Sequence, residues 1–268
     1  MEKIELSPNP DSGARLVGYL HDKAEEMPNF LKRPCVVVCP GGGYEYCSAR
    51  EADPVALAFF GRGYNTFILY YSVGKEAAQL RPLTDLSLSV LKIRKNCEEW
   101  GILPDKIAVC GFSAGGHLAA SLGTLWNSPL LAAAGGGAVG NGNRPDAMIL
   151  GYPVISAGKY AHKGSLHLVS GDQTEFLKLL SLEKQVTPET PPAFLWHTAD
   201  DGCVPVQNTL LFAAALLEKG VPFECHIYPH GNHGMSMCTA EVNCPSPHLA
   251  TWFPLCIEWL ENLFGFPS

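Results

Sequence analysis

The sequence has few charged residues, and it contains no basic cluster. Only 17% of its 268 residues are Asp, Glu, Lys or Arg, below the roughly 25% of an ordinary soluble chain. Because 47% are hydrophobic, the chain can bury a large core, which excludes a disordered protein. The 26 acidic residues outnumber the 19 basic ones, for a formal net charge of −7. This balance argues against a nucleic-acid partner.

Signals for export, membrane insertion and disulfide pairing are also lacking. Residues 1–8 contain no unbroken apolar stretch of the kind found in secretory signals, so we expect a cytoplasmic protein with no membrane partner. The uncharged stretch at 107–143 is interrupted by glycines, Asn127 and Pro129 into pieces shorter than the ~20 residues of a membrane span. None of the ten cysteines forms a Cys-x-x-Cys pair, and several lie in apolar runs, so we expect reduced core thiols.

The chain does contain a regular alternation of two kinds of segment. Short apolar runs predict strands at 35–39, 66–71, 107–110, 147–152, 193–197 and 223–228, with an edge strand at 15–20. Longer periodic runs predict helices at 53–60, 86–100, 114–126, 176–184, 206–219 and 249–264. Residues 103–105 are predicted to form a turn, and 132–143 a Gly-rich surface loop.

This alternation predicts an α/β fold with a mainly parallel central sheet and helices on both faces. No polar linker or shift in composition divides the chain. We therefore expect one domain over 1–268, in which 159–191 forms a small cap-like segment.

One motif is the strongest indication of chemistry. Gly111-Phe112-Ser113-Ala114-Gly115 has the pattern Gly-x-Ser-x-Gly and stands directly between a predicted strand and a predicted helix. That setting is typical of a nucleophile elbow, a sharp turn that exposes the serine hydroxyl. The glycines let the backbones approach closely there. An ordinary Gly-rich turn is the alternative interpretation.

A nucleophilic serine needs a histidine as its base, and the histidine needs an acid to orient it. In this fold class the acid and then the histidine follow the serine along the chain. His233 lies in a Gly-flanked loop after the strand predicted at 223–228, and we expect it to be the base. His230 is its nearest rival. His117, one helical turn after Ser113, is expected to pack near the site.

Two adjacent carboxylates follow the strand predicted at 193–197. Asp201 precedes Val204-Pro205 at the Asp-x-x-Val-Pro spacing usual in such hydrolases, so we expect Asp201 to orient the histidine. Asp200 is the alternative acid. If Asp201 has that role, Asp200 is expected to cap or brace the loop.

Acyl transfer also needs N–H groups to meet the negative charge that develops on the carbonyl oxygen. The glycine run at 41–43, after the first strong strand, can aim backbone N–H groups into the site, and Ala114 can supply another. A plain glycine turn is one alternative interpretation. A phosphate-binding loop is the competing functional one, but the chain lacks both a dinucleotide fingerprint and a Gly-Lys-Ser/Thr sequence.

A zinc site is a further interpretation, because His226, His230 and His233 are spaced by four and three residues. On a helix they would share one face, but Pro229 and Gly231 interrupt any helix there. We expect neither a metal nor a cofactor.

Four segments together resemble a known family. They are Pro40-Gly41-Gly42-Gly43-Tyr44, 100–118 with the serine motif, 191–201 and Gly231-Asn232-His233-Gly234. In these segments the chain resembles the acetyl-xylan-esterase-like and lipase-like esterases of the α/β-hydrolase superfamily.

The resemblance implies a triad of Ser113, Asp201 and His233, with Gly42 and Gly43 supplying oxyanion N–H groups. Many relatives begin the oxyanion loop with His-Gly-Gly, whereas here Pro40 holds the histidine position. Proline removes one N–H group and stiffens the loop but leaves those of the two glycines.

We therefore expect a serine hydrolase that cleaves short-acyl carboxylic esters through an acyl-enzyme on Ser113, with acetylated sugars as candidate substrates. The many charged residues at 159–191 favour a polar roof over a lipid groove. A peptidase or amidase using the same triad is one alternative. A hydrolase-fold binding protein without catalysis is another, but such proteins usually lack a triad residue and none is missing here.

Overall fold

One sheet organises the fold. The strands are β1 (Glu2–Leu6), β2 (Arg15–Leu20), β3 (Arg33–Cys39), β4 (Asn65–Tyr70), β5 (Ile102–Phe112), β6 (Ala147–Gly151), β7 (Ala193–Thr198) and β8 (Phe223–Tyr228). The computed structural model describes residues 1–137 and 140–267, and there the strand order is β1-β2-β4-β3-β5-β6-β7-β8. Strands β3 to β8 are parallel, whereas β1 and β2 extend the sheet antiparallel beyond β4. The predicted mainly parallel sheet is confirmed.

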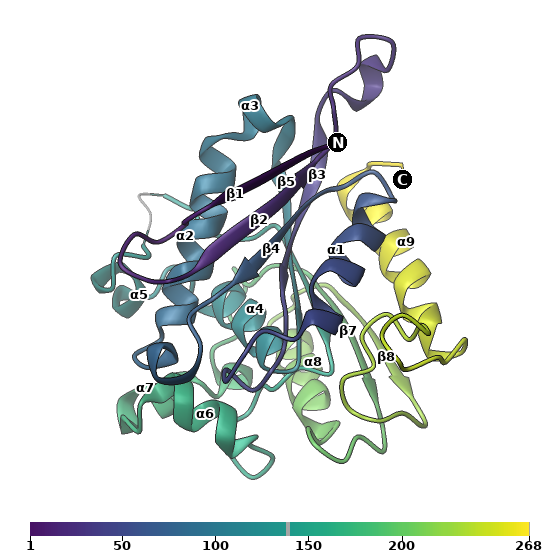
Figure 1. The fold of residues 1–268 in the computed structure, drawn as a ribbon. Helices are drawn as coiled ribbons and strands as arrows, with labels where there is room; N and C mark the ends of the chain where they lie inside the picture. The colour runs from purple at the N-terminus through teal and green to yellow at the C-terminus, as the bar shows by residue number, and fades with distance from the viewer. Residues whose placement is uncertain (138–139, 268) are drawn as a thin grey trace.

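Helices cover both faces of this sheet (Figure 1). They are α1 (Asp53–Phe60), α2 (Arg81–Lys95), α3 (Cys97–Trp100), α4 (Ala114–Leu125), α5 (Pro129–Ala133), α6 (Lys163–Ser170), α7 (Thr174–Leu179), α8 (Gln207–Glu218) and α9 (Trp252–Phe264). Helices α1 and α9 share one apolar core with the sheet, and α2, α4 and α8 share the other.

Strand β3 shows why both faces attract helices. All of its residues are buried, and successive strand side chains point to opposite faces. Val36 and Val38 pack into the core with α1 and α9, whereas Val37 packs into the core on the other face. Each fully buried valine contributes about 1.5–3 kcal/mol relative to an exposed one. A continuous apolar strand is therefore stable only between two helical layers.

Two strands differ from the prediction. The sequence pattern does not predict β1, because its side chains are mostly exposed and pairing with β2 alone defines it. Strand β5 begins at Ile102, so the turn predicted at 103–105 is wrong. That segment is an irregularity inside the strand, where the register between β3 and β5 shifts. Arg33 pairs with Ile102 and Cys35 pairs with Ile107, so β5 advances five residues while β3 advances two.

The helices also differ from the prediction in their limits. The helix predicted at 86–100 is divided into α2 and α3 at Asn96, whose φ of −104° and ψ of 16° leave the helical region. The helix predicted at 176–184 ends at Leu179 as α7, and a 3-10 turn, η4 (Leu182–Lys184), follows. The helix predicted at 249–264 begins with a 3-10 turn, η5 (Leu249–Thr251). The Gly-rich loop predicted at 132–143 overlaps α5, and its residues 138–139 lie outside the described residues.

Cysteine burial follows the expectation of core thiols. All ten cysteines are free, and six are buried: Cys35, Cys39, Cys97, Cys110, Cys238 and Cys256. Across 1–137 and 140–267, none of the helices has the length and apolar character needed to cross a membrane.

Candidate active site

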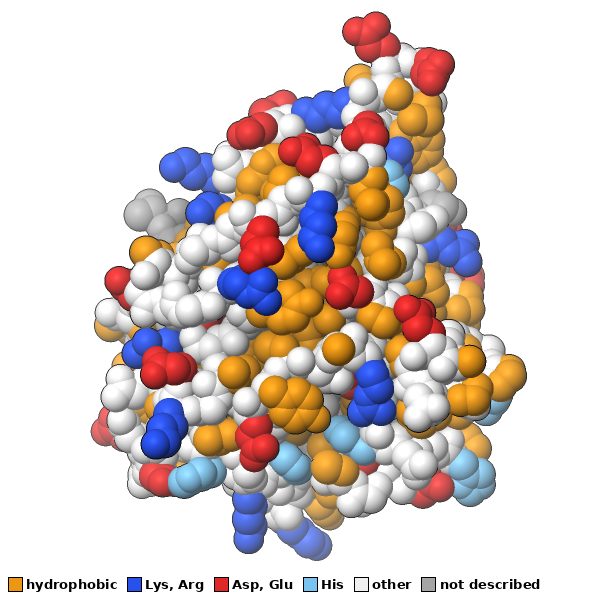
Figure 2. Space-filling view, in the orientation of Figure 1, with side chains coloured by type: hydrophobic (Ala, Val, Ile, Leu, Met, Phe, Trp, Pro, Cys, Tyr) orange, Lys and Arg blue, Asp and Glu red, His pale blue; other side chains and the backbone are white. Residues whose placement is uncertain are grey.

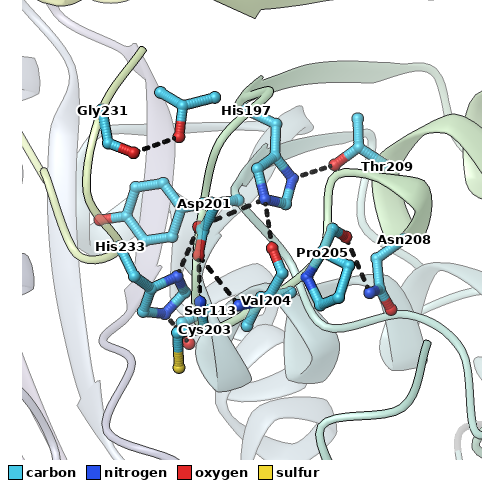
Figure 3. A network of polar contacts seen from close by, with 12 residues as sticks. Ser113, His197, Asp201, Cys203, Val204, Pro205, Asn208, Thr209, Gly231 and His233 are labelled. Atoms are coloured by element: carbon cyan, nitrogen blue, oxygen red, sulfur yellow. Dashed lines mark hydrogen bonds and ion pairs between the residues drawn. The ribbon is translucent and has the colours of Figure 1, made fainter.

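The singled-out residues follow four of the parallel strands. The glycine run comes after β3, Ser113 after β5, Asp201 after β7 and His233 after β8. Because the carboxyl ends of parallel strands meet at one edge of a sheet, these segments lie together. Figure 3 shows Ser113, His233 and Asp201 in contact at this edge.

Ser113 lies on a strained turn between β5 and α4. Its φ of 53° and ψ of −120° are rare for a residue other than glycine, and such strain costs about 1–3 kcal/mol. Its N–H donates to the carbonyl oxygen of Gly151 at 3.0 Å, and its own carbonyl accepts from the N–H groups of Val154 at 3.1 Å and His117 at 3.0 Å. These hydrogen bonds hold the strained backbone in place.

The two glycines of the motif allow the backbones to approach closely. A Cβ atom on Gly111 would lie 2.0 Å from the carbonyl oxygen of Gly115. A Cβ on Gly115 would lie 2.1 Å from the carbonyl oxygen of Cys39 on β3. Neither contact is sterically possible, so the turn requires glycine at both positions.

His233 connects the serine to a carboxylate. Its Nε2 lies 2.8 Å from Oγ of Ser113, and its Nδ1 lies 2.7 Å from Oδ2 of Asp201. An ionised carboxylate can only accept, so Nδ1 carries the proton and Nε2 can accept the serine proton. The imidazole packs edge-on against Tyr152, with ring centroids 5.1 Å apart and planes at 70°. The structure thus brings together the three residues singled out from the sequence.

Several donors converge on the carboxylate of Asp201. Its Oδ1 accepts the N–H groups of Cys203 at 2.8 Å and Val204 at 2.9 Å. Its Oδ2 accepts from His233 and lies 3.4 Å from Nε2 of the fully buried His197. Burial acts to raise the pKa of this carboxyl, but hydrogen bonds with His197 and His233 outweigh it and hold the pKa well below the ordinary 3.8. Asp201 is therefore ionised beside His233.

His197 has a fixed place in this network. Its Nε2 lies 2.9 Å from the carbonyl oxygen of Val204, and its Nδ1 lies 2.7 Å from the hydroxyl of Thr209 (Figure 3). A proton on Nε2 is shared between that carbonyl and Asp201, while Nδ1 accepts from the hydroxyl. The loop that carries Asp201 is thereby tied to β7 and α8.

Asp200, the alternative acid, lies beside a different histidine. Its Oδ2 is 2.9 Å from Nδ1 of His230, and its Oδ1 accepts the N–H of Gly231 at 2.8 Å. The hydrogen bond from His230 is the main cause that lowers the pKa of Asp200. Asp200 therefore braces the loop that carries His233.

The three closely spaced histidines do not converge on a common point. Nε2 of His226 lies 2.7 Å from Glu224, His230 pairs with Asp200, and His233 pairs with Asp201. In the part of the chain that the structure describes, no group of three or more His, Cys, Asp or Glu side chains is arranged to hold a metal ion.

The glycine turn after β3 lines the same cavity as Ser113 and His233. Gly42 has a φ of 124° and Gly43 a φ of 67°, and a Cβ on Gly42 would lie 2.1 Å from the carbonyl oxygen of Tyr46. Among the described residues, no hydrogen bond uses the N–H groups of these two glycines. Ala114 is the first residue of α4, where an N–H has no acceptor within the helix. All three N–H groups can therefore serve a ligand.

The cavity around Ser113 is small, and charged or polar side chains make up about half of its lining residues. Its volume is about 170 Å³. Tyr46 stands at its edge with 57% of its surface exposed. Figure 2 shows several histidine side chains, in pale blue, toward the end of the molecule where α6 and α7 lie in Figure 1. The lining residues are Gly42, Gly43, Tyr46, Ser48, Arg50, Glu51, Ser113, His162, Cys203, His233 and Gly234.

The segment 159–191 reaches the cavity through His162 and contacts α4 through Leu180. His162, directly before α6, lines the cavity, and its Nδ1 lies 2.8 Å from the hydroxyl of Ser165. Farther along, the carbonyl oxygen of Leu180 lies 3.2 Å from Nε2 of His117, whose Nδ1 lies 3.0 Å from the hydroxyl of Tyr44. Burial lowers the pKa of His117 to about 4, so this ring is neutral and links α4 to both neighbours.

Sequence reasoning missed four residues near the site: Glu51, Tyr152, His162 and His197. His162 belongs to no motif. His197 lies in the segment 191–201 that carries the resemblance, but nothing in that segment marks it as a partner of Asp201. Glu51 stands just before an apolar helix, where an acid ordinarily complements the helix dipole, so the pattern gives no sign that it is buried. Tyr152 is the first residue after β6, and this position at a strand end is the only sequence signal that could have marked it.

Comparisons with known proteins place the chain in a family. The BD-FAE family model matches residues 25–216. The chain is 39% identical over 236 residues to endo-1,4-beta-xylanase B of Butyrivibrio fibrisolvens, covering 84% of this chain and 35% of that protein. It is 28% identical over 270 residues to acetylxylan esterase of Xylanibacter ruminicola, covering 98% of this chain and 49% of that protein. The chain thus spans only a third to a half of these relatives.

A solved structure matches over nearly the whole chain. It is the acetyl ester-xyloside bifunctional hydrolase from Caldicellulosiruptor lactoaceticus, with a TM-score of 0.82 and 37% identity over 97% of this chain and 91% of that one. The solved structures similar to this chain are α/β hydrolases, which confirms the predicted fold class. The chain therefore belongs to the BD-FAE family and has the α/β-hydrolase fold.

Proposed function

We propose that this protein is a carboxylic ester hydrolase that works through an acyl-enzyme on Ser113. The observation that carries the proposal is the hydrogen-bonded chain from Ser113 through His233 to Asp201, 2.8 Å and 2.7 Å long, in a cavity that glycine N–H groups line. This arrangement has the three parts that acyl transfer needs, namely a nucleophile, an oriented base and donors for an oxyanion.

Acylation begins when Oγ of Ser113 attacks the ester carbonyl carbon and its proton passes to Nε2 of His233. The carbonyl π electrons move to oxygen, and the N–H groups of Gly42, Gly43 and Ala114 bind the resulting negative charge. The tetrahedral intermediate collapses, the carbon–oxygen bond to the alcohol breaks, and His233 returns its proton to the leaving oxygen. The alcohol departs and the acyl group stays on Ser113.

Deacylation repeats these steps with water. His233 takes a proton from water as the oxygen attacks the acyl carbon, and the same N–H groups stabilise the second oxyanion. Collapse breaks the bond to Oγ of Ser113, which recovers its proton from the imidazolium, and the carboxylic acid leaves. In both halves Asp201 stays ionised and stabilises the imidazolium, since hydrogen bonds hold its pKa low.

We further propose that the acyl group is short and that sugars carry it. A cavity of about 170 Å³ suits an acetyl or propionyl group, and none of its described lining residues is aliphatic. A long chain would gain little there, because each methylene contributes only about 0.8 kcal/mol even when it is fully buried. The exposed ring of Tyr46 and the polar side chains among the lining residues suit a hydroxyl-rich alcohol. Two of the relatives are named for acetylxylan or acetyl esters. We also propose that 159–191, which brings His162 to the cavity, is a small cap within a single domain.

A substrate panel tests this proposal. The purified protein is given p-nitrophenyl acetate, butyrate, octanoate and palmitate, acetylated xylo-oligosaccharides, and p-nitroanilides of the same acyl groups. We expect kcat/KM to be highest for the acetate and for the acetylated sugar, with anilides cleaved far more slowly. Preferred cleavage of anilides would indicate an amidase or peptidase. No turnover of any member, with no labelling of Ser113 by an organophosphonate, would indicate a binding protein.

A further inference from the structure

Glu51 is a buried carboxylate that the proposed mechanism does not use. It ends the 3-10 turn η2 (Ala49–Glu51), is only 2% exposed and lines the cavity that contains Ser113. Burial raises the pKa of this carboxyl, against the hydrogen bonds from Tyr152 and Gly41. Placing an ionisable group in such an environment costs free energy unless hydrogen bonds offset it. Its two partners therefore indicate what it does.

One carboxylate oxygen holds the glycine turn. Oε2 accepts the N–H of Gly41 at 2.8 Å, and the next two residues are Gly42 and Gly43. A Cβ on Gly41 would lie 2.6 Å from the same oxygen, so the approach is possible only to glycine. The contact fixes the backbone immediately before the N–H groups assigned to the oxyanion.

The other oxygen holds the histidine loop through Tyr152. Oε1 accepts the hydroxyl of Tyr152 at 2.6 Å, and that hydroxyl accepts the N–H of Ser236 at 2.8 Å. The ring of Tyr152 packs against His233, and Ser236 lies three residues after it. The hydroxyl of Ser236 returns to the carbonyl oxygen of Arg50 at 2.5 Å, which closes a ring of contacts beside Glu51.

We propose that Glu51 is a positioning residue that aligns the oxyanion turn with the histidine loop around Ser113. This inference rests on the proposed function. A single carboxylate suits the task because both partners donate and each oxygen can accept. An amide at this position offers one accepting oxygen, so it turns an NH₂ group toward either Gly41 or Tyr152. A misplacement of about 1 Å in a catalytic site can cost ~10²-fold in rate.

The test compares Glu51→Gln with a matched control. Asp85 is also a fully buried carboxylate, and it accepts from Asn9 at 2.7 Å, Ser12 at 2.8 Å and Ser72 at 2.7 Å. None of these residues lines the cavity. Asp85→Asn should therefore lower the thermal midpoint but leave kcat for p-nitrophenyl acetate within about twofold of wild type. Glu51→Gln should lower kcat by about tenfold or more, with KM within about threefold.

A double-mutant cycle measures whether the effects of two substitutions on kcat are coupled, which a general loss of stability would not produce. Tyr152→Phe keeps the ring against His233 and removes only the hydroxyl between Glu51 and Ser236. We expect it to lower kcat by about threefold or more and to add little in the Glu51→Gln background, because both changes break one chain of contacts. If Glu51→Gln fails to fold, Tyr152→Phe tests the proposal alone.

Three results would overturn the inference. The first is a kcat within about twofold of wild type in folded Glu51→Gln or, where that variant does not fold, in Tyr152→Phe. The second is an equal loss of kcat in Asp85→Asn, and the third is additive effects in the cycle. A wild-type protein that hydrolyses no ester, or a Ser113→Ala variant that stays active, would overturn the proposed function and this inference with it. If the wild type is active and Ser113→Ala is inactive, a negative result counts against the proposed role of Glu51 alone.

Discussion

Replacing Asp201 with asparagine changes one oxygen atom of the side chain to an NH₂ group. The backbone N–H groups of Cys203 and Val204 both donate to Oδ1, so the amide oxygen must stay on that side. The NH₂ group then takes the place of Oδ2 and faces Nδ1 of His233, which lies 2.7 Å away in the wild type. Two donors cannot share that contact, so the imidazole must move its proton to Nε2.

In that tautomer, Nε2 of His233 presents an N–H to Ser113 and cannot accept its proton. The loss expected for the wrong tautomer is about 10⁴ in kcat, equivalent to about 5 kcal/mol of transition-state stabilisation. The fold should persist, since the two backbone N–H groups keep an acceptor. Initial rates on p-nitrophenyl acetate measure the effect, with circular dichroism to verify folding.

Asp200→Asn is the matched control for this prediction. Asp200 is adjacent in sequence and has the same chemistry, but it contacts His230 and Gly231 near the surface. We expect it to lower kcat by no more than about threefold, as for an exposed polar contact. A larger loss in Asp200→Asn than in Asp201→Asn would refute the reasoning and reverse the assignment of the acid.

Three further outcomes are expected. Gly115→Ala, whose Cβ would lie 2.1 Å from the carbonyl oxygen of Cys39, should destabilise the fold by about 3 kcal/mol in urea unfolding, whereas Gly13→Ala, with no atom within 4 Å, should not. The folded pKa of Asp201 lies below the ordinary 3.8, so the ionised carboxylate stabilises the fold above pH 3.8, and this stabilisation is lost as the pH falls through the folded pKa. The wild-type free energy of unfolding in urea should therefore exceed that of Asp201→Asn at pH 7 by a margin that shrinks below about pH 4. A constant difference from pH 7 to pH 3 would contradict this. Tyr46→Ala should raise KM for acetylated xylo-oligosaccharides about fivefold and leave p-nitrophenyl acetate unchanged, and equal effects on both would exclude a sugar contact.

Local sequence patterns were sufficient to predict a feature where a single strand, helix or motif determines it. The apolar run in β3 and the stripe in α2 predict their elements because strand and helix periods differ. The serine motif could be interpreted because its glycines, its strand and its helix are contiguous. The spacing of Asp201 from Val204-Pro205 singled out the carboxylate that the structure places beside His233.

Contacts between distant segments could not be derived in this way. Strand β1 exists through pairing with β2, and its exposed side chains give no apolar signal. Glu51 is joined to Tyr152 across 101 positions of sequence, and no periodicity relates them. His162 reaches the cavity only because 159–191 folds back toward the strand ends. These placements depend on tertiary packing, which overrides local preference.

Hydrolysis of p-nitrophenyl acetate by folded Ser113→Ala tests whether Ser113 is the nucleophile that forms the acyl-enzyme. Alanine removes Oγ, the atom that lies 2.8 Å from Nε2 of His233, and it leaves the N–H groups around the cavity in place. We expect kcat to fall by roughly 10³ or more from the wild-type value, as for loss of the nucleophile in other triads. A kcat within about tenfold of wild type in a variant with native circular dichroism would contradict an acyl-enzyme on Ser113.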